Sequence, residues 1–181
     1  MANAAQRPLL FLDVDGPLIP FGTLPDHPQA AAHAPAPAGE GNPLLERLDP
    51  GIGARLLALG CDLVWATTWM EKANEVVAPR IGLPNLPVAD RQDATGDTEP
   101  GPRGLHWKTR HLVGYAGRRP FIWVDDEISS MDRLWVAAQH PGPSLLQRVD
   151  PARGLTDADF SAITEWLGTV TPSRRDDEMP R

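Results

Sequence analysis

Two aspartates separated by one residue end the first apolar segment of the chain. The segment reads LLFL from Leu9, and Asp13 and Asp15 follow it directly, before a break at Gly16 and Pro17. Two carboxylates this close repel each other, so each is costly to ionise without a neighbouring positive charge. A chain that places both at the end of an apolar strand therefore needs a cation there, either a metal ion or a basic side chain.

Three further groups of polar residues are candidates to join this pair. They are Thr67 and Thr68 after LVWA, Lys108 at the start of a predicted helix, and Asp125, Asp126 and Glu127 after FIWV. In open parallel sheets, sites form outside the carboxyl ends of the strands, so these side chains are expected to meet there. Clustered carboxylates with few other donors are ligands for Mg²⁺, and a lysine and a hydroxyl beside them suit a phosphate. The constellation predicts Mg²⁺-assisted phosphoryl transfer.

Apolar strand-like segments and helical segments alternate along most of the chain. The expected strands are 8–14, 61–68, 85–89, 120–124 and 144–149. The expected helices are 42–59, whose main part is expected to start at Asp49 and Pro50, then 69–82, 105–116, 128–139 and 156–168. Such alternation is typical of a parallel sheet with helices on both faces. We therefore expect an α/β fold, a Rossmann-like three-layer sandwich with a mostly parallel five-stranded sheet.

The length of 181 residues and a hydrophobic content of 41% suit one domain with a sizeable core. We expect this domain to span residues 1–170. Residues 17–43 are rich in proline and alanine without a helical or strand period, and are expected to form a loop inserted after the first strand. The polar tail 171–181 is expected to be disordered, and no segment is large enough for a separate cap domain.

The net charge and the cysteine content limit the binding partners and the cellular compartment that are expected for this protein. With 17 basic and 24 acidic residues the net charge is −7, which argues against binding along an extended nucleic-acid backbone but leaves recognition of one phosphate open. Cys61 is the single cysteine, so no internal disulfide can form. Without a signal-peptide-like start or an apolar run of membrane-spanning length, the chain is expected to be cytoplasmic and to have no membrane partner.

The four groups of polar residues, taken in order, resemble the four motifs of the haloacid dehalogenase (HAD) superfamily. They are LDVDGPL, LVWATT, Lys108 and IWVDDE, and they lie between Leu9 and Glu127. The stretch WATTWMEKANEVVAPRIGLP, together with WVDDE, further resembles the HAD-type phosphatase domains of multidomain RNA-repair proteins. This resemblance implies a HAD-like fold and a phosphatase activity.

The resemblance also implies catalytic roles. Asp13 would be the nucleophile that accepts the phosphoryl group as an aspartyl-phosphate, and Asp15 would be the general acid and base. Thr67, rather than Thr68, would bind a phosphoryl oxygen. Lys108 would neutralise the phosphate and Asp13, although Arg110 in the same segment, or Lys72 or Arg103, are alternative cations.

The Mg²⁺ ligands implied by the resemblance are Asp13, the backbone carbonyl of Asp15, and the acidic pair Asp125 and Asp126. Asp125 is favoured as the direct ligand of that pair. Glu127 is expected to cap the following helix or to support the ligands from outside, because acidic residues are favourable at a helix N-terminus.

The substrate side of the site is assigned to Gly16, Thr68 and Trp69. Gly16 allows the chain to turn sharply away from the strand. Trp69 and Trp107 lie next to Thr67 and Lys108 in sequence, so either ring is a candidate to stack on a base or sugar, although packing in the core is the common role of tryptophan. An open site without a cap suits a bulky phosphorylated substrate, with a nucleotide or polynucleotide end as the leading candidate.

Two other functions are compatible with parts of the pattern. A response-receiver domain also combines acidic residues, threonine and lysine, but there the acidic pair comes first and the lysine last, which is not the order here. A catalytically weak HAD-fold binding or regulatory module would keep the fold without turnover. Within the superfamily, an acid at Asp15 favours hydrolysis of a phosphate ester over cleavage of a C–Cl or C–P bond.

Overall fold

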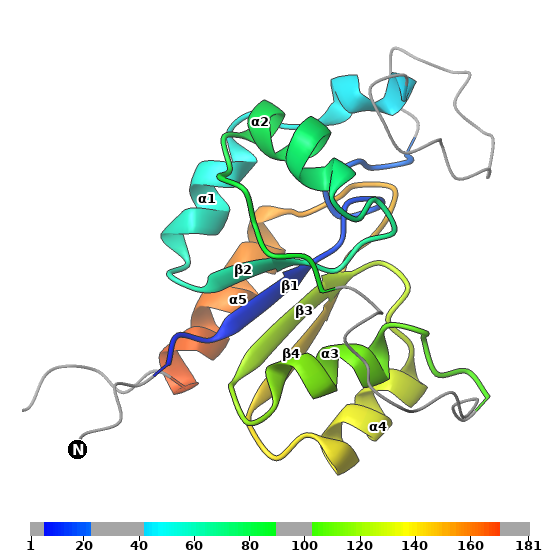
Figure 1. The fold of residues 1–181 in the computed structure, drawn as a ribbon, viewed down its shortest axis with the longest axis vertical. Helices are drawn as coiled ribbons and strands as arrows, with labels where there is room; N and C mark the ends of the chain where they lie inside the picture. The colour runs from blue at the N-terminus through cyan, green and yellow to red at the C-terminus, as the bar shows by residue number, and fades with distance from the viewer. Residues whose placement is uncertain (1–5, 23–41, 90–102, 171–181) are drawn as a thin grey trace, which may run out of the picture.

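A computed structural model describes residues 6–22, 42–89 and 103–170 of the chain (Figure 1). Its centre is one parallel sheet of four short strands in the order β2-β1-β3-β4. The strands are β1 (Leu9–Leu12), β2 (Asp62–Trp65), β3 (Phe121–Asp125) and β4 (Ser144–Arg148). Every residue of the two central strands is buried, as the continuous apolar runs of a doubly covered parallel sheet predict.

Helices cover both faces of this sheet, which confirms the expected α/β class. They are the 3₁₀ helix η1 (Pro43–Arg47), α1 (Ile52–Ala58), the π-helix η2 (Ala73–Val77), α2 (Ala78–Ile81), α3 (Thr109–Ala116), α4 (Ser130–Gln139) and α5 (Asp157–Val170). One core cluster packs α1, α2 and α5 against Leu10 and Leu12, and the other packs α3 and α4 against Leu9 and Phe11. Alternate residues of β1 thus face opposite layers.

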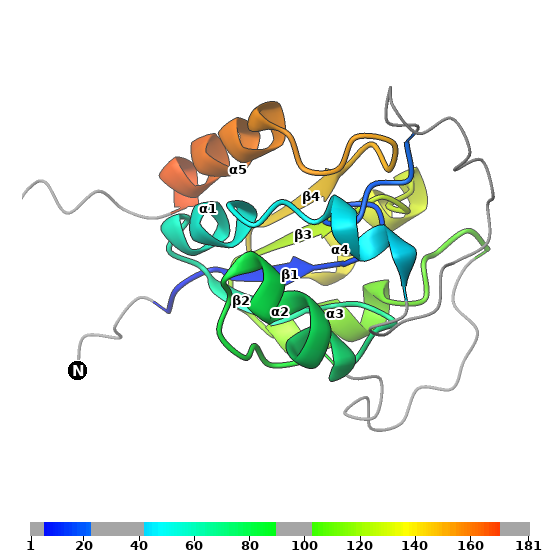
Figure 2. The same ribbon diagram turned by 90° about the horizontal axis from the view of Figure 1, so that it is seen from above.

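Packing between helices fixes the first of these layers. Arg55 of α1 donates to Asp157 at the start of α5, with 2.7 Å between Nη2 and Oδ1, and its guanidinium lies 4.0 Å from the ring centroid of Phe160. The two helices lie side by side in both views (Figures 1 and 2). This layer covers the face of the sheet that carries Leu10 and Leu12.

The prediction of a strand at 85–89 is wrong: the described residues form a sheet of four strands, and this segment is not one of them. Only a single bridge remains there, between Val88 and Trp65. Trp65 N donates to Pro87 O and Ala89 N donates to Trp65 O, each at 2.8 Å. Pro84 and Pro87 have no N–H to donate, so a longer ladder cannot form at this edge.

Two predicted helices are interrupted. The predicted helix 42–59 is divided between η1 and α1 by Asp49 and Pro50, whose ring favours a new helix start. The predicted helix 69–82 begins as η2 and continues as α2, and it ends at Gly82 with φ of +73°. A residue without a Cβ adopts this left-handed conformation at little cost.

Several expectations lie partly or wholly outside the described residues. Of the proline- and alanine-rich segment, 23–41 are outside, while Leu18 and Ile19 are buried against the core. The tail 171–181 and the polar segment 90–102 are outside as well. Among the described helices, none has the length and apolar character needed to cross a membrane.

Candidate active site

A buried ion-pair cluster lies at the carboxyl ends of the two central strands. Asp13 follows β1, Asp125 ends β3, and Lys108 immediately precedes α3. Lys108 Nζ is 2.8 Å from Asp13 Oδ2 and 2.7 Å from Asp125 Oδ2. The pairing of β1 with β3 continues one step beyond the strands, where Asp13 N donates to Val124 O at 3.1 Å. The lysine chosen from the sequence is therefore the one that reaches both carboxylates.

The carboxylate of Asp125 is held on both sides by the protein. Its Oδ2 also accepts from Trp123 Nε1 at 3.1 Å, and its Oδ1 accepts from Glu127 N at 2.9 Å. Asp125 is completely buried. These bonds orient Asp125 toward Lys108, so Asp125 anchors the lysine ammonium. Its role as a direct metal ligand stays a prediction.

Asp126 is half-buried and brings a third carboxylate to the same place. Oxygens of Asp13, Asp125 and Asp126 all lie within 4.8 Å of one another. Gly16 makes room for this approach, since a Cβ at Gly16 would lie 2.6 Å from Asp126 Cγ. Its φ of +87° is also a conformation that other residues rarely adopt. Gly16 thus allows the loop after β1 to pack against Asp126.

The cluster contains more negative than positive charge. Burial raises the pKa of Asp13 to about 7 even though Lys108 lowers it. Burial, followed by the charge of Asp125, raises the pKa of Asp126 to about 6. Burial alone would lower the pKa of Lys108, but Asp13 and Asp125 outweigh that effect and raise it. One ammonium does not balance three carboxylates, so this all-oxygen donor set fits a divalent cation such as Mg²⁺.

Asp15 is held by a hydrogen bond from a tryptophan. Trp69 Nε1 donates to Asp15 Oδ2 at 2.9 Å. Burial raises the pKa of Asp15, and the bonds and charges from Trp69 and Lys108 only partly oppose this. The side chain of Trp69 is only 2% exposed, so its ring has the core packing that was the alternative to stacking on a substrate. Its indole instead orients Asp15.

The segment after β2 brings the threonines to the same edge of the sheet. Ala66 N donates to Leu12 O at 2.9 Å, which keeps this segment beside the end of β1. Thr67 is buried and its Oγ1 accepts from Trp69 N at 3.3 Å, whereas Thr68 is exposed. Met70 has φ of +52°, a strained value for a residue other than glycine. This turn carries Trp69 back into the core.

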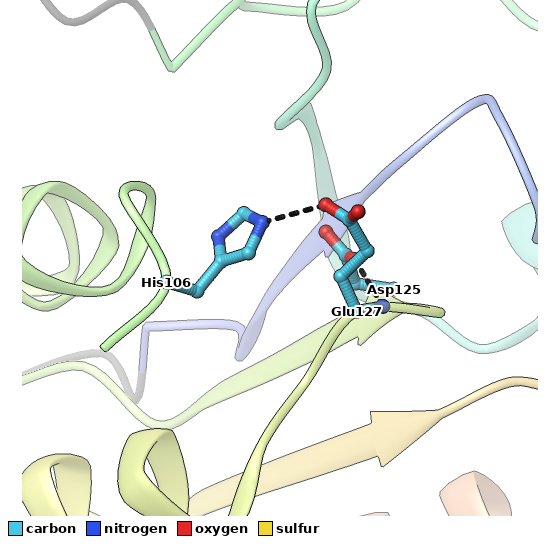
Figure 3. Close-up of side chains that lie close together, drawn as sticks. All are labelled: His106, Asp125 and Glu127. Carbon is cyan, nitrogen blue, oxygen red and sulfur yellow. Dashed lines mark hydrogen bonds and ion pairs between the residues drawn. The ribbon is translucent and has the colours of Figure 1, made fainter. Parts of the chain in front are cut away.

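His106 also lies in this neighbourhood, on the segment that precedes Lys108. His106 Nε2 lies 3.0 Å from Glu127 Oε2, and Figure 3 shows the ring pointing toward that carboxylate beside Asp125. Lys108 N donates to His106 Nδ1 at 3.2 Å. Because Nδ1 accepts, the proton of a neutral ring is on Nε2, which donates to Glu127. The two residues are separated by 21 positions, so only the fold could pair them.

Trp107 presents an aromatic surface next to the cluster. Its side chain is 49% exposed, and Lys108 Nζ lies 5.5 Å from its ring centroid. The ring is therefore both open to solvent and within a short distance of the ammonium that joins Asp13 to Asp125. Of the two tryptophans considered from the sequence, this one has the exposure that stacking requires.

Comparison with protein families identifies the domain. A family model described as "HAD domain in Swiss Army Knife RNA repair proteins" matches residues 9–160, most of the chain. The chain belongs to this HAD family. The matched region includes all three acidic residues of the cluster and Lys108, and the family is one of HAD-type hydrolases. No curated protein and no solved structure matched the chain significantly.

Proposed function

We propose that this HAD domain is a Mg²⁺-dependent phosphatase that hydrolyses a phosphate monoester through an aspartyl-phosphate on Asp13. The observation that carries the proposal is the cluster in which Lys108 contacts both Asp13 and Asp125 while Asp126 lies within reach. A buried nucleophile beside an ammonium and surplus carboxylates is suited to phosphoryl transfer. The carboxyl of Asp15, held separately by Trp69, supplies a second acid with a raised pKa.

In the first step, a carboxylate oxygen of Asp13 attacks phosphorus and the ester P–O bond breaks. Asp15 donates its proton to the leaving oxygen, a role that its raised pKa supports. The ammonium of Lys108 stabilises the negative charge on the phosphoryl oxygens. The hydroxyl of Thr67 accepts a bond from Trp69 N through its oxygen, so its proton remains available to a phosphoryl oxygen.

In the second step, Asp15 acts as a base. It takes a proton from water, whose oxygen attacks phosphorus and breaks the bond to Asp13, releasing inorganic phosphate and restoring both carboxyl groups. Asp13, Asp126 and the backbone carbonyl of Asp15 would hold Mg²⁺, which supplies charge neutralisation for the carboxylates and the phosphate. Asp125 serves this chemistry by holding Lys108.

The substrate proposed is the phosphorylated end of a nucleotide or polynucleotide. The membership in a family of RNA-repair HAD domains supports this choice, and so does the exposed ring of Trp107 beside Lys108. A net charge of −7 disfavours contacts along an extended backbone, so recognition is confined to the terminal phosphate and its neighbouring nucleoside. We place the protein in the cytoplasm, in keeping with its single, buried cysteine.

The test is hydrolysis of p-nitrophenyl phosphate with Mg²⁺ and with EDTA, followed by a panel of 3′- and 5′-phosphorylated oligonucleotides, mononucleotides and sugar phosphates. We expect metal-dependent turnover that Asp13→Asn abolishes and that Asp157→Asn, which changes an exposed acid on α5, leaves unchanged. Full turnover by Asp13→Asn would exclude the mechanism. Binding of Mg²⁺ without turnover would instead favour the catalytically weak binding module, and equal rates on all phosphates would exclude the nucleic-acid assignment.

A further inference from the structure

A buried aspartate on α4 holds the segment that carries Lys108. Asp132 is completely buried. Its Oδ1 accepts from His106 N at 2.8 Å and from Thr109 Oγ1 at 2.5 Å. Its Oδ2 accepts from Ser129 N at 2.8 Å and from Ser129 Oγ at 2.6 Å. One carboxylate therefore gathers four hydrogen bonds from two segments that are distant in sequence.

The two segments are those that bring the catalytic groups together. His106 and Thr109 lie on either side of Lys108, so the bonds to Oδ1 hold the His106 backbone N–H before the lysine and the Thr109 hydroxyl after it. Ser129 is the N-cap of α4 and lies shortly after Asp125, the anchor of the lysine ammonium. Asp132 thus joins the base of the Lys108 side chain to the loop that holds its tip.

We propose that Asp132 is a positioning residue that sets Lys108 against Asp13 and Asp125; the inference rests on the proposed phosphatase function. Capping α4 requires only Oδ2, which with Ser129 completes a capping box. The bonds of Oδ1 add nothing to that cap and are directed entirely to the segment of Lys108. The cap of α4 therefore has a second use, as a brace for the phosphate-binding lysine.

A second set of contacts holds the Lys108 segment through His106, Glu127 and Asp125. Lys108 N donates to His106 Nδ1, and His106 Nε2 donates to Glu127 (Figure 3). Glu127 N in turn donates to Asp125, which accepts from Lys108 Nζ. Lys108 is thus held at its backbone and at its ammonium by one closed circuit. Asp132 fixes the backbone N–H of His106, a member of the circuit that lies outside the helices and strands.

The carboxylate form of Asp132 is needed for this role. Burial would raise its pKa, but the hydrogen bonds from Ser129, Thr109 and His106 lower it below the ordinary value. An asparagine has the same shape but only one acceptor oxygen. In Asp132→Asn the amide NH₂ must face either the Ser129 pair or the pair from His106 and Thr109, where donor would meet donor.

The chain contains a matched control at the start of α5. Asp159 accepts from Thr156 N at 2.8 Å and from Thr156 Oγ1 at 2.5 Å through Oδ2, and from Gln147 Nε2 at 2.7 Å through Oδ1. It repeats the cap of Asp132 and likewise binds a second element, but it does not contact the Lys108 segment. Asp159→Asn therefore reproduces the loss of a helix cap without disturbing the proposed brace.

The experiment compares Asp132→Asn with Asp159→Asn in the full chain, alone and combined with Lys108→Ala. We expect Asp159→Asn to lower Tm by about 2–4 °C, as loss of a cap does, and Asp132→Asn to lower it further, because Asp132 and its donor Thr109 are completely buried. Asp132→Asn should lower kcat/KM on p-nitrophenyl phosphate by at least about tenfold, because a small displacement of a catalytic group is costly. In the Lys108→Ala background it should have almost no further effect, since residues acting as a unit are not additive.

Two results would overturn the proposal: equal activity of the two Asn variants, or an undiminished effect of Asp132→Asn when Lys108 is already absent. Hydrogen exchange provides a readout that does not depend on turnover. The amides of His106 and Lys108 should exchange about tenfold faster in Asp132→Asn and unchanged in Asp159→Asn. If the wild type proved inactive, the proposed function would fail, while this exchange result would still decide whether Asp132 holds the segment.

Discussion

The burial of Asp13 predicts that the metal-free protein loses stability as the pH rises. Asp13 is 7% exposed, and burial raises its pKa from the ordinary 3.8 to about 7. A carboxyl whose pKa is raised by folding binds its proton more tightly in the folded state than in the unfolded chain. The folded state is therefore favoured at low pH, and this advantage is lost as the pH rises from about 4 through about 7.

The size of the effect follows from the pKa. Between pH 5 and about pH 7 the unfolded chain has lost the Asp13 proton while the folded protein still holds it, a span of about two pKa units. At about 1.4 kcal/mol per unit, this makes the free energy of unfolding about 3 kcal/mol lower at pH 8 than at pH 5. The raised pKa of Asp126 acts in the same direction.

Urea unfolding in EDTA at pH 5 and pH 8 measures this change, with Asp13→Asn as the perturbation. The variant removes the titrating group, so wild type should lose about 3 kcal/mol relative to it between the two pH values. Any constant cost of the substitution cancels in this comparison. Mg²⁺ should restore the wild type at pH 8, because binding to the folded state alone stabilises it, and should leave Asp13→Asn nearly unchanged.

The control is Asp157→Asn, because the side chain of Asp157 is 94% exposed and outside the cluster. Its difference from wild type should not vary with pH by more than about 0.5 kcal/mol. If wild type and Asp13→Asn lost or gained stability in parallel between pH 5 and pH 8, the raised pKa inferred for the buried Asp13 carboxyl would be wrong. A stabilisation by Mg²⁺ as large at pH 5 as at pH 8 would contradict it equally.

Three further predictions concern the metal, the loop after β1 and the substrate. Asp126→Asn should weaken Mg²⁺ binding, measured by calorimetry, at least about tenfold more than Asp125→Asn; the reverse order would restore Asp125 as the direct ligand. Gly16→Ala should lower the free energy of unfolding by about 1–3 kcal/mol and weaken Mg²⁺ binding, because its Cβ would displace Asp126; an unchanged urea midpoint would argue against this contact. Trp107→Ala should raise KM for a 3′-phosphorylated oligonucleotide by about fivefold or more but leave glycerol phosphate unaffected, with Trp107→Phe restoring the oligonucleotide; equal changes on both substrates would rule out stacking.

The local sequence pattern was sufficient to predict those elements whose environment is uniform, as in the two buried central strands. The continuous apolar runs predicted both central strands because a doubly covered sheet leaves them no polar face. The prediction of an edge strand at 85–89 failed, because Pro84 and Pro87 limit pairing there to a bridge at Val88. Apolar composition alone did not reveal that difference.

The choice between adjacent residues depended on tertiary contacts. Asp125 and Asp126 are both aspartates, so the sequence does not distinguish them, but the side chains of neighbouring residues at a strand end point to opposite sides of the sheet. The position of Lys108 decides which side is which, because it faces Asp125. The place of Trp69 was likewise set by tertiary contacts, because its ring is buried in the core and its Nε1 donates to Asp15.

The sequence by itself determined the alternation of strands and helices, and therefore that polar residues from separate motifs meet at one edge of the sheet. It also determined the excess of acids over the single lysine in that group. Only the tertiary structure decided which carboxylate faces Lys108, that Trp69 holds Asp15, and that Asp132 braces the lysine segment. Such pairings join residues that are distant in the chain, and their geometry is set by packing and register rather than by local preference.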